Sequence, residues 1–265
     1  MLRDITIGQY YQADSIIHRL DPRVKLIGTF AYIIALFVAK NVWGYVLATV
    51  FLIGAIKLSK VPVKYMLKGM KAIAFLIVIT VAFNLFMTPG ETLVSIWKLT
   101  ITKQGATTAA TMAVRLVYLI VGSSVMTLTT TPNELTDALE SVLGPLKKIK
   151  VPVHEIAMMM SIALRFIPIL MDETDKIMKA QIARGANFES GNIIERAKSL
   201  IPLLVPLFIS AFRRANDLAM AMEARCYQGG ERRTKMKPLK YVRADYTGLV
   251  VLIVFFVGMI ATRWL

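Results

Sequence analysis

The stretch VKLIGTFAYIIALFVAK, residues 24–40, carries charge only at Lys25 and Lys40 and is otherwise apolar or weakly polar. A helix needs about 20 predominantly apolar residues, within a range of roughly 17–25, to cross the hydrocarbon core of a bilayer. Four further stretches have a similar length and composition, namely residues 42–58, 72–88, 106–128 and 245–263. We therefore predict an all-α integral membrane protein with about five transmembrane helices.

The composition of the whole chain agrees with this prediction. Of its 265 residues, 56% are hydrophobic and 18% are charged, whereas soluble domains average about 45–50% apolar and roughly 25% charged residues. The chain carries 32 Lys and Arg against 17 Asp and Glu, a net charge of +15. Nucleic-acid binding would also explain this charge, but it would leave the apolar stretches unexplained. We predict a basic cytoplasmic face, contact with membrane lipid, and no nucleic-acid partner.

The basic residues orient the predicted helices in the cell membrane. Five lysines occupy the loop between the second and third helices (Lys57, Lys60, Lys64, Lys68 and Lys71). The preceding loop carries only Lys40. Because cytoplasmic loops hold the excess of Lys and Arg, we expect a cytoplasmic N-terminus. An odd number of spans then places the C-terminus outside, in a multi-pass prokaryotic membrane protein.

Residues 129–244 differ from the rest of the chain. We predict that they form a helical cytoplasmic coupling domain, between transmembrane residues 1–128 and a C-terminal transmembrane helix at 245–265. The helix at about 153–184 has only about 16 apolar residues, interrupted by Arg165 and Pro168, so we expect it not to cross the bilayer.

The second long helix of this region, at about 190–227, is amphipathic. One apolar stripe follows it at spacings of four and three residues, namely Leu204, Phe208, Ala211, Ala215, Leu218 and Met222. Both long helices are apolar early and polar late. We therefore expect both to begin at the membrane surface and to project away from it.

Both long helices are predicted to end with alanine and arginine followed by a small residue. The two triplets are Ala183-Arg184-Gly185 and Ala224-Arg225-Cys226. Glycine suits the left-handed conformation that ends a helix, and a cation suits the helix dipole, so capping alone accounts for the first triplet. Because Cys226 replaces glycine, capping explains the second triplet less well. A guanidinium flanked by small residues can instead enter a partner's groove and bind a carboxylate there.

The paired triplets resemble those of the transmembrane (T) subunit of energy-coupling factor transporters. The segments DSIIHRLDPRVKLIG at 14–28 and FNLFMTPGE at 83–91 also resemble that family, so the resemblance covers essentially the whole chain. It implies a subunit without catalytic residues that joins two cytoplasmic ABC-type ATPases, A and A′, to one interchangeable S-component. The S-component alone binds a vitamin or metal ion. Arg184 would dock one ATPase and Arg225 the other.

The same resemblance implies a platform for the S-component. We assign it to Met158, Met159, Met160, Leu200, Leu204 and Phe208. Methionine suits a surface that repacks against different partners, although packing against lipid headgroups or a neighbouring helix would explain the same residues. The two long helices would act as levers that carry ATP-driven motion to the S-component. No phosphate-binding loop occurs in the sequence, so ATP and magnesium are expected in the partner ATPases and no cofactor in this chain.

Two alternative functions stay open. One is a dedicated cobalt- or nickel-type T subunit. The other is a membrane-embedded lipid-transfer enzyme that would use Asp172 and Asp175 to bind a diphosphate through magnesium. We favour the simpler interpretation that these aspartates pair with Lys176 and Lys179 on a solvated helix face.

Three further ionisable residues lie outside these motifs. Arg115 lies inside the fourth predicted span, where it either has a function or pairs with the bundle or the backbone. His18 and His154 have no Cys or His neighbours, so we predict no metal site.

Overall fold

The computed structural model describes residues 10–39, 41–96, 99–186, 188, 192–229, 236 and 238–264. These residues form two compact units. The bundle unit holds the described residues between 10 and 138 and between 239 and 264. The hairpin unit holds those between 139 and 238.

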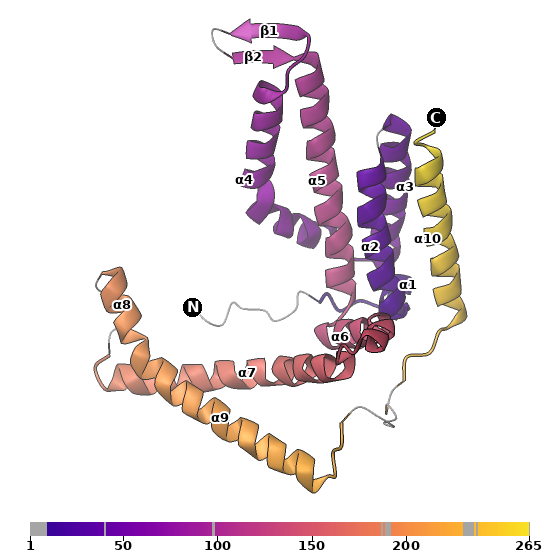
Figure 1. The fold of residues 1–265 in the computed structure, drawn as a ribbon. Coiled ribbons are helices and arrows are strands. Elements are labelled where there is room, and N and C mark those ends of the chain that lie inside the picture. The colour runs from indigo at the N-terminus through magenta and orange to yellow at the C-terminus, as the bar shows by residue number, and fades with distance from the viewer. Residues whose placement is uncertain are drawn as a thin grey trace. The chain divides into compact units, whose positions relative to one another are not determined.

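The bundle unit contains the helices predicted to span the membrane. They are α2 (Pro22–Val38), α3 (Val42–Ser59), α4 (Val63–Met87), α5 (Lys103–Thr129) and α10 (Arg243–Ala261), accompanied by the short α1 (Ile16–Arg19) and the start of α6 (Pro132–Val142). Within this unit α2, α3 and α10 lie side by side and α4 packs along α5 (Figure 1). The predicted all-α membrane fold is confirmed, and each predicted span is a helix.

Length and composition select a slightly different set of candidate spans. In the described part of the chain, α3, α5, α10 and α7 (Val153–Ala183) are long and apolar enough to cross a membrane. The apolar part of α4, Ile73–Met87, is shorter. The count of about 16 apolar residues at 153–184 is therefore too low, because α7 has 31 residues and its charges are few where it is most apolar. The cytoplasmic position of residues 129–244 stays a prediction.

One short β-hairpin interrupts the helical bundle. After Pro89 and Gly90 stop α4, β1 (Thr92–Ile96) pairs antiparallel with β2 (Leu99–Thr102). Both strands are rich in β-branched residues, which favour extended backbone. The Thr102 hydroxyl accepts the Gly105 N–H at 3.0 Å and so caps α5. This hairpin is not among the elements predicted from the sequence.

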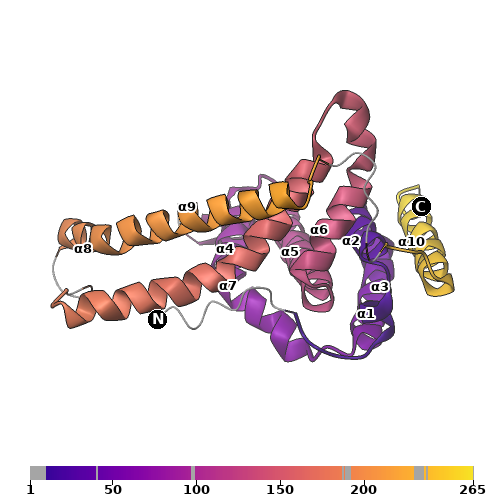
Figure 2. The same cartoon turned by 90° about the horizontal axis from the view of Figure 1, so that it is seen from below.

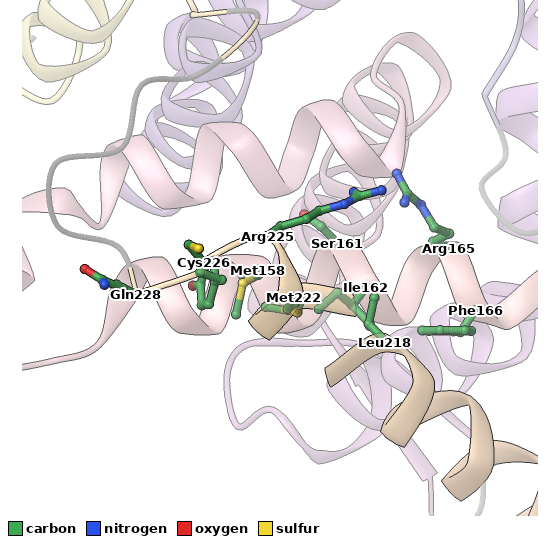
Figure 3. A pocket seen from close by; sticks show the side chains of 12 residues that line it. Met158, Ser161, Ile162, Arg165, Phe166, Leu218, Met222, Arg225, Cys226 and Gln228 are labelled. Carbon is green, nitrogen blue, oxygen red and sulfur yellow. The ribbon is translucent and has the colours of Figure 1, made fainter. Parts of the chain in front are cut away.

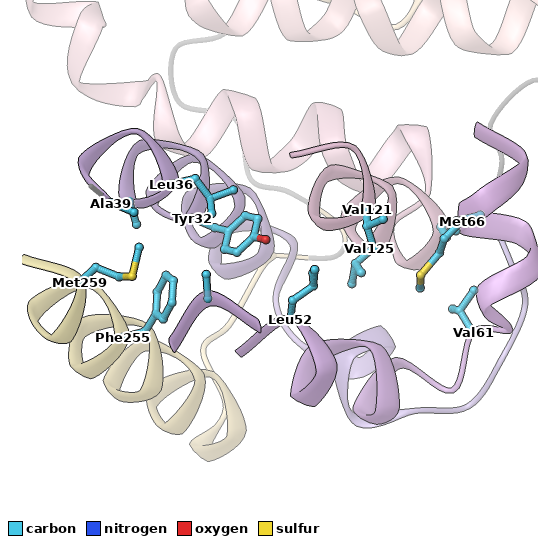
Figure 4. Close-up of a cluster of buried hydrophobic side chains, with 13 residues drawn as sticks. Tyr32, Leu36, Ala39, Leu52, Val61, Met66, Val121, Val125, Phe255 and Met259 are labelled. Carbon is cyan, nitrogen blue, oxygen red and sulfur yellow. The ribbon is translucent and has the colours of Figure 1, made fainter. Parts of the chain in front are cut away.

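Aromatic stacking holds α2, α3 and α10 together. The Phe51 and Phe255 rings are 4.2 Å apart between centroids, and Tyr32 stacks on both at 5.9 and 6.0 Å. Figure 4 shows the surrounding buried cluster, to which α5 contributes Val121 and Val125. Gly122 on α5 leaves room for the Tyr32 ring, because a β-carbon there would overlap it. The ring stack fixes the spacing of the bundle helices.

Buried polar contacts join the beginnings of α2 and α10. Asp245 is 2% exposed, and its carboxylate accepts the backbone N–H groups of Asp21 and Val242, each at 2.7 Å. Burial raises the pKa of the Asp21 carboxyl, but hydrogen bonds from the side chain and backbone of Arg23 outweigh it and hold that pKa below its ordinary value. These bonds satisfy backbone donors that a helix N-terminus leaves unpaired.

Arg115 on α5 caps the C-terminal end of α2. Its Nη2 donates to the carbonyl of Ala39, the C-cap residue of α2, at 3.2 Å, and its guanidinium lies 5.6 Å from the Phe37 ring centre. A cation at a helix C-terminus satisfies a free carbonyl and complements the helix dipole. Of the two interpretations of Arg115, the structure favours pairing with the backbone.

The hairpin unit is built on two antiparallel helices, α7 and α9 (Ile201–Ala224). The 3-10 helix η2 (Gly144–Ile149) precedes α7, and α8 (Ile193–Ser199) precedes α9. At one end Gln181 donates to the Pro202 carbonyl at 3.2 Å, and midway Arg214 pairs with Glu173 at 3.1 Å. Figure 2 shows the two helices running alongside one another. The expectation that both project in one direction is wrong, because the chain reverses between them.

Candidate partner-docking site

α7 ends in a Schellman motif. The Ala186 N–H donates to the Gln181 carbonyl at 3.0 Å, and the Gly185 N–H donates to the Ile182 carbonyl at 2.9 Å. Gly185 has a φ of +90°, in the left-handed region where glycine has no steric cost. Arg184 is the C-cap residue, with φ −87° and ψ 4°.

α9 ends in the same motif. The Tyr227 N–H donates to the Met222 carbonyl at 3.0 Å, and the Cys226 N–H donates to the Glu223 carbonyl at 2.8 Å. Arg225 is the C-cap residue, with φ −93° and ψ 14°, and Cys226 has a φ of +55°. The expectation that capping explains the second triplet less well is therefore wrong. Cysteine occupies the left-handed position that glycine fills at the end of α7.

Capping accounts for the backbone of both triplets but not for their guanidinium groups. Every residue of the two triplets is exposed, namely Ala183, Arg184, Gly185, Ala224, Arg225 and Cys226. In the described part of the chain, neither the Arg184 nor the Arg225 side chain has a hydrogen-bond or ion-pair partner. Both arginines can therefore donate to an acceptor on another molecule.

The two arginines lie at opposite ends of the α7–α9 pair. Arg225 lines a cavity together with Ile162, near the start of α7, whereas Arg184 follows the last residue of α7. At about 1.5 Å per residue, the stretch from Ile162 to Arg184 covers roughly 33 Å. The α7–α9 pair thus presents one arginine at each end.

A second arginine accompanies Arg225. The cavity at this end has a volume of about 700 Å³ and is lined by Met158, Ser161, Ile162, Arg165, Phe166, Leu218, Met222, Arg225, Cys226, Tyr227, Gln228 and Gly229. Figure 3 shows the side chains of Arg165 and Arg225 reaching toward one another from α7 and α9. None of these lining residues is acidic. The cavity therefore suits an anionic group, such as a carboxylate, that would pair with both cations.

In the sequence, Arg165 stands out only as an interruption of the apolar part of α7. Met158, Ile162 and Arg165 follow one another at spacings of four and three residues, which places them on one helix face. That spacing was visible in the sequence. The partner helix that Arg165 faces was not.

The predicted S-component platform falls into two groups in the structure. Leu200, Leu204 and Phe208 are exposed and lie one turn apart at the start of α9. The three successive methionines lie near the start of α7, where Met158 lines the cavity and Met159 and Met160 are exposed. Because the helices are antiparallel, the two groups lie toward opposite ends of the pair. A single platform made of all six residues stays a prediction.

Asp172 and Asp175 on α7 are the residues predicted for a magnesium-bound diphosphate. Among the described residues, no group of three His, Cys, Asp or Glu side chains lies close enough to hold a metal ion. Asp172 is exposed and Asp175 is half-buried. The ion pair of this region is Glu173 with Arg214, which joins α7 to α9, and the described side chains show no Asp172–Lys176 or Asp175–Lys179 pair.

Comparison with known proteins identifies the family. A family model described as CbiQ, cobalt transport protein, matches residues 13–236. A protein of Ruminiclostridium cellulolyticum is 54% identical over 264 residues, covering 100% of this chain and 99% of its own, and one of Bacillus subtilis is 49% identical over 255 residues, covering 96% of each. Both are named energy-coupling factor transporter transmembrane protein EcfT. The chain belongs to the EcfT family.

Membership of the EcfT family confirms the resemblance found in the sequence. The chain is the transmembrane component of an energy-coupling factor transporter, and its relatives carry the name of a transporter subunit rather than of an enzyme. The matched range 13–236 includes both arginine triplets. The cavity and the exposed arginines of the hairpin unit therefore belong to a protein that functions within an assembly.

Proposed function

We propose that this EcfT chain couples two cytoplasmic ATPases to a substrate-binding S-component during the uptake of vitamins. The observation that carries the proposal is the pair of exposed arginines, Arg184 and Arg225, held at opposite ends of one helix pair by the same backbone motif. Two equivalent arginines without partners in the described part of the chain favour two equivalent external acceptors. Two ATPases of similar structure meet that requirement.

The spacing of the arginines supports separate docking sites. The stretch from Ile162 to Arg184 covers roughly 33 Å at about 1.5 Å per residue, so a single groove would not hold both side chains. Each guanidinium has a planar arrangement of donors that fits a carboxylate through two parallel hydrogen bonds. Movement of the two ATPases upon binding ATP and magnesium would then displace both ends of the α7–α9 pair.

The S-component is proposed to dock on the exposed apolar side of α9. This side has residues at one-turn spacing that are each more than a third exposed, namely Leu200, Ile201, Leu204, Val205, Phe208, Ile209 and Phe212. An apolar surface of this extent on a helix favours burial against another protein or lipid. We propose that it lies on the cytoplasmic side, together with the N-terminus, as the basic loops indicate.

Assembly tests this proposal most directly. The chain would be coexpressed with both ATPases and purified through an affinity tag on the chain, and the ATPase recovered would be measured for wild type, Arg184→Ala, Arg225→Ala and the double variant. Removing a buried interfacial arginine typically costs about 2–5 kcal/mol, so each single variant should lower affinity at least about 30-fold. The double variant should recover no ATPase.

A matched control separates docking from general loss of charge. Arg213 is exposed on α9 but lies away from either helix end, so Arg213→Ala should leave ATPase recovery unchanged. Arg184→Lys and Arg225→Lys keep the charge but lose the planar donor arrangement, and they should bind weakly. Full recovery in the double alanine variant would show that neither arginine docks an ATPase.

The substrate class would be tested by the S-components that copurify. Recovery of S-components for several vitamins would support a shared T subunit. Recovery of only a cobalt- or nickel-specific S-component would instead identify a dedicated metal transporter. This second candidate rests on the description of the matched family model, cobalt transport protein.

A further inference from the structure

The 3-10 helix η2 and its N-cap residue carry an exposed apolar edge. A 3-10 helix has three residues per turn, so side chains three positions apart line up along one edge. Leu143, Leu146 and Ile149 have this spacing, and they are 39%, 37% and 72% exposed. These three side chains, which we call the η2 edge, are apolar and lie at the surface of the hairpin unit.

Lysines surround the η2 edge. Lys147, Lys148 and Lys150 are all exposed, and they occupy the remaining sides of the same turns. No acidic residue occurs in the sequence between Glu140 and Glu155. The segment therefore combines an apolar edge with three lysines that form no ion pair among the described residues. This is the pattern of a helix that lies in the membrane interface.

The segment has a defined conformation that keeps the edge exposed. The Leu146 N–H donates to the Leu143 carbonyl at 2.9 Å, and the Lys150 N–H donates to the Lys147 carbonyl at 3.0 Å. Lys150 has a φ of +62° and ends the turn. Across the base of this loop, His154 on α7 contacts the Glu140 carboxylate at 2.9 Å.

The short chain segment between α5 and η2 allows η2 to reach a membrane surface. Leu143 follows Thr129, the last residue of α5, by 14 positions. α5 is long and apolar enough to cross a membrane, and the end of a spanning helix lies at the surface of the bilayer. A lysine-rich segment this near the surface is attracted by anionic headgroups, and each Lys contributes a factor of about five to membrane binding.

We propose that η2 is an interfacial anchor, in which the η2 edge enters the headgroup region and Lys147, Lys148 and Lys150 bind anionic lipid headgroups. We choose anionic lipid as the binding partner because its charge is opposite to that of the three lysines. These lysines surround the apolar edge on a protein that resides in a membrane. This anchor would hold the beginning of α7 at the membrane surface. The inference is independent of ATPase docking through Arg184 and Arg225.

Site-specific fluorescence in reconstituted protein tests the anchor. The chain has one cysteine, so Cys226→Gly provides a cysteine-free background whose glycine suits the φ of +55° at that position. Ile149→Cys, Leu146→Cys and Lys148→Cys would each be labelled with an environment-sensitive fluorophore in nanodiscs containing brominated acyl chains. The probes at 149 and 146 should be quenched several-fold more than the probe at 148.

The lipid requirement is tested in the same assay. Quenching at 149 should increase when phosphatidylglycerol is added to phosphatidylcholine nanodiscs, and the triple variant Lys147→Gln, Lys148→Gln, Lys150→Gln should lower that increase at least about fivefold. The proposal is overturned if the 149 and 146 probes are quenched no more than the 148 probe, or if phosphatidylglycerol has no effect. It is equally overturned if these probes become shielded only after the ATPases or an S-component are added.

Discussion

At the scale of single residues, Cys226 bears a conformational cost that Gly185 avoids. Both residues occupy the left-handed position of a Schellman motif, with φ values of +55° and +90°. The left-handed conformation costs a non-glycine residue about 1–2 kcal/mol. Cys226→Gly should therefore raise the free energy of unfolding by up to about 1 kcal/mol, and Gly185→Ala should lower it by a similar amount.

Thermal unfolding in detergent would measure both changes, and ATPase recovery would serve as the functional readout. Cys226→Gly should preserve ATPase binding, since Arg225 keeps its backbone conformation. If Cys226→Gly destabilised the protein or abolished docking, the thiol itself would have a role that the backbone geometry does not reveal.

Arg165 gives a second prediction at this scale. Because its side chain lines the same cavity as Arg225 and points toward it, the two cations should act together on one acceptor. Arg165→Ala should weaken ATPase binding less than Arg225→Ala does. In a double-mutant cycle the two changes should be non-additive by about 0.5–3 kcal/mol, whereas Arg184→Ala and Arg225→Ala should add within roughly 0.5 kcal/mol.

Affinity measurements on the purified complex would give both cycles. Strict additivity of Arg165 with Arg225 would mean that they contact different groups. Arg213→Ala, on the exposed side of α9, is the matched control and should not couple with either.

At the scale of elements, the packing of α5 on α2 depends on one glycine. A β-carbon at Gly122 would overlap the Tyr32 ring, whereas a β-carbon at Gly54 on α3 would meet no atom within 4 Å. Gly122→Ala should destabilise the bundle by about 1–3 kcal/mol through overpacking. Gly54→Ala should be neutral or should stabilise α3 by up to about 1 kcal/mol.

The difference between these two alanine variants is best followed by thermal unfolding in one detergent. Equal effects of the two substitutions would mean that Tyr32 moves aside and that the ring stack with Phe51 and Phe255 tolerates the change.

The elements themselves were largely predictable from the sequence, because apolar length and helix breakers are local properties. α3, for example, was expected at 42–58 and spans Val42–Ser59. The hairpin of β1 and β2 was missed because its two strands have only five and four residues, too short for a periodic pattern to stand out.

The candidate site was predictable in its residues but not in its arrangement. The two triplets stand out in the sequence as a repeated motif, yet no local pattern shows that α7 and α9 are antiparallel. That reversal places Arg184 and Arg225 at opposite ends of the helix pair and brings Arg165 near Arg225. It also separates Met158 from the apolar residues at the start of α9. Contacts between elements decide each of these points.

At the scale of the whole molecule, the α7–α9 pair must be stiff if motion at its ends is to reach an S-component. The Glu173–Arg214 ion pair joins the two helices midway, at 3.1 Å. Both side chains are partly exposed, at 26% and 39%, so this pair contributes at most about 1 kcal/mol to stability. Its position between the two proposed docking ends makes it a candidate for transmitting force rather than for folding.

Glu173→Gln should therefore leave ATPase recovery and thermal unfolding nearly unchanged while lowering ATP-driven uptake by the assembled transporter several-fold. The measurement is substrate uptake into proteoliposomes, normalised to the amount of assembled complex and compared with ATP hydrolysis. Hydrolysis without matching uptake would show that the helices still dock both ATPases but no longer move as one body. Asp172 is exposed on α7 and immediately precedes Glu173. Asp172→Asn therefore removes the same charge without removing a contact to α9, and it should leave uptake intact. If both substitutions lowered uptake equally, the loss would come from the charge of α7 and not from its link to α9.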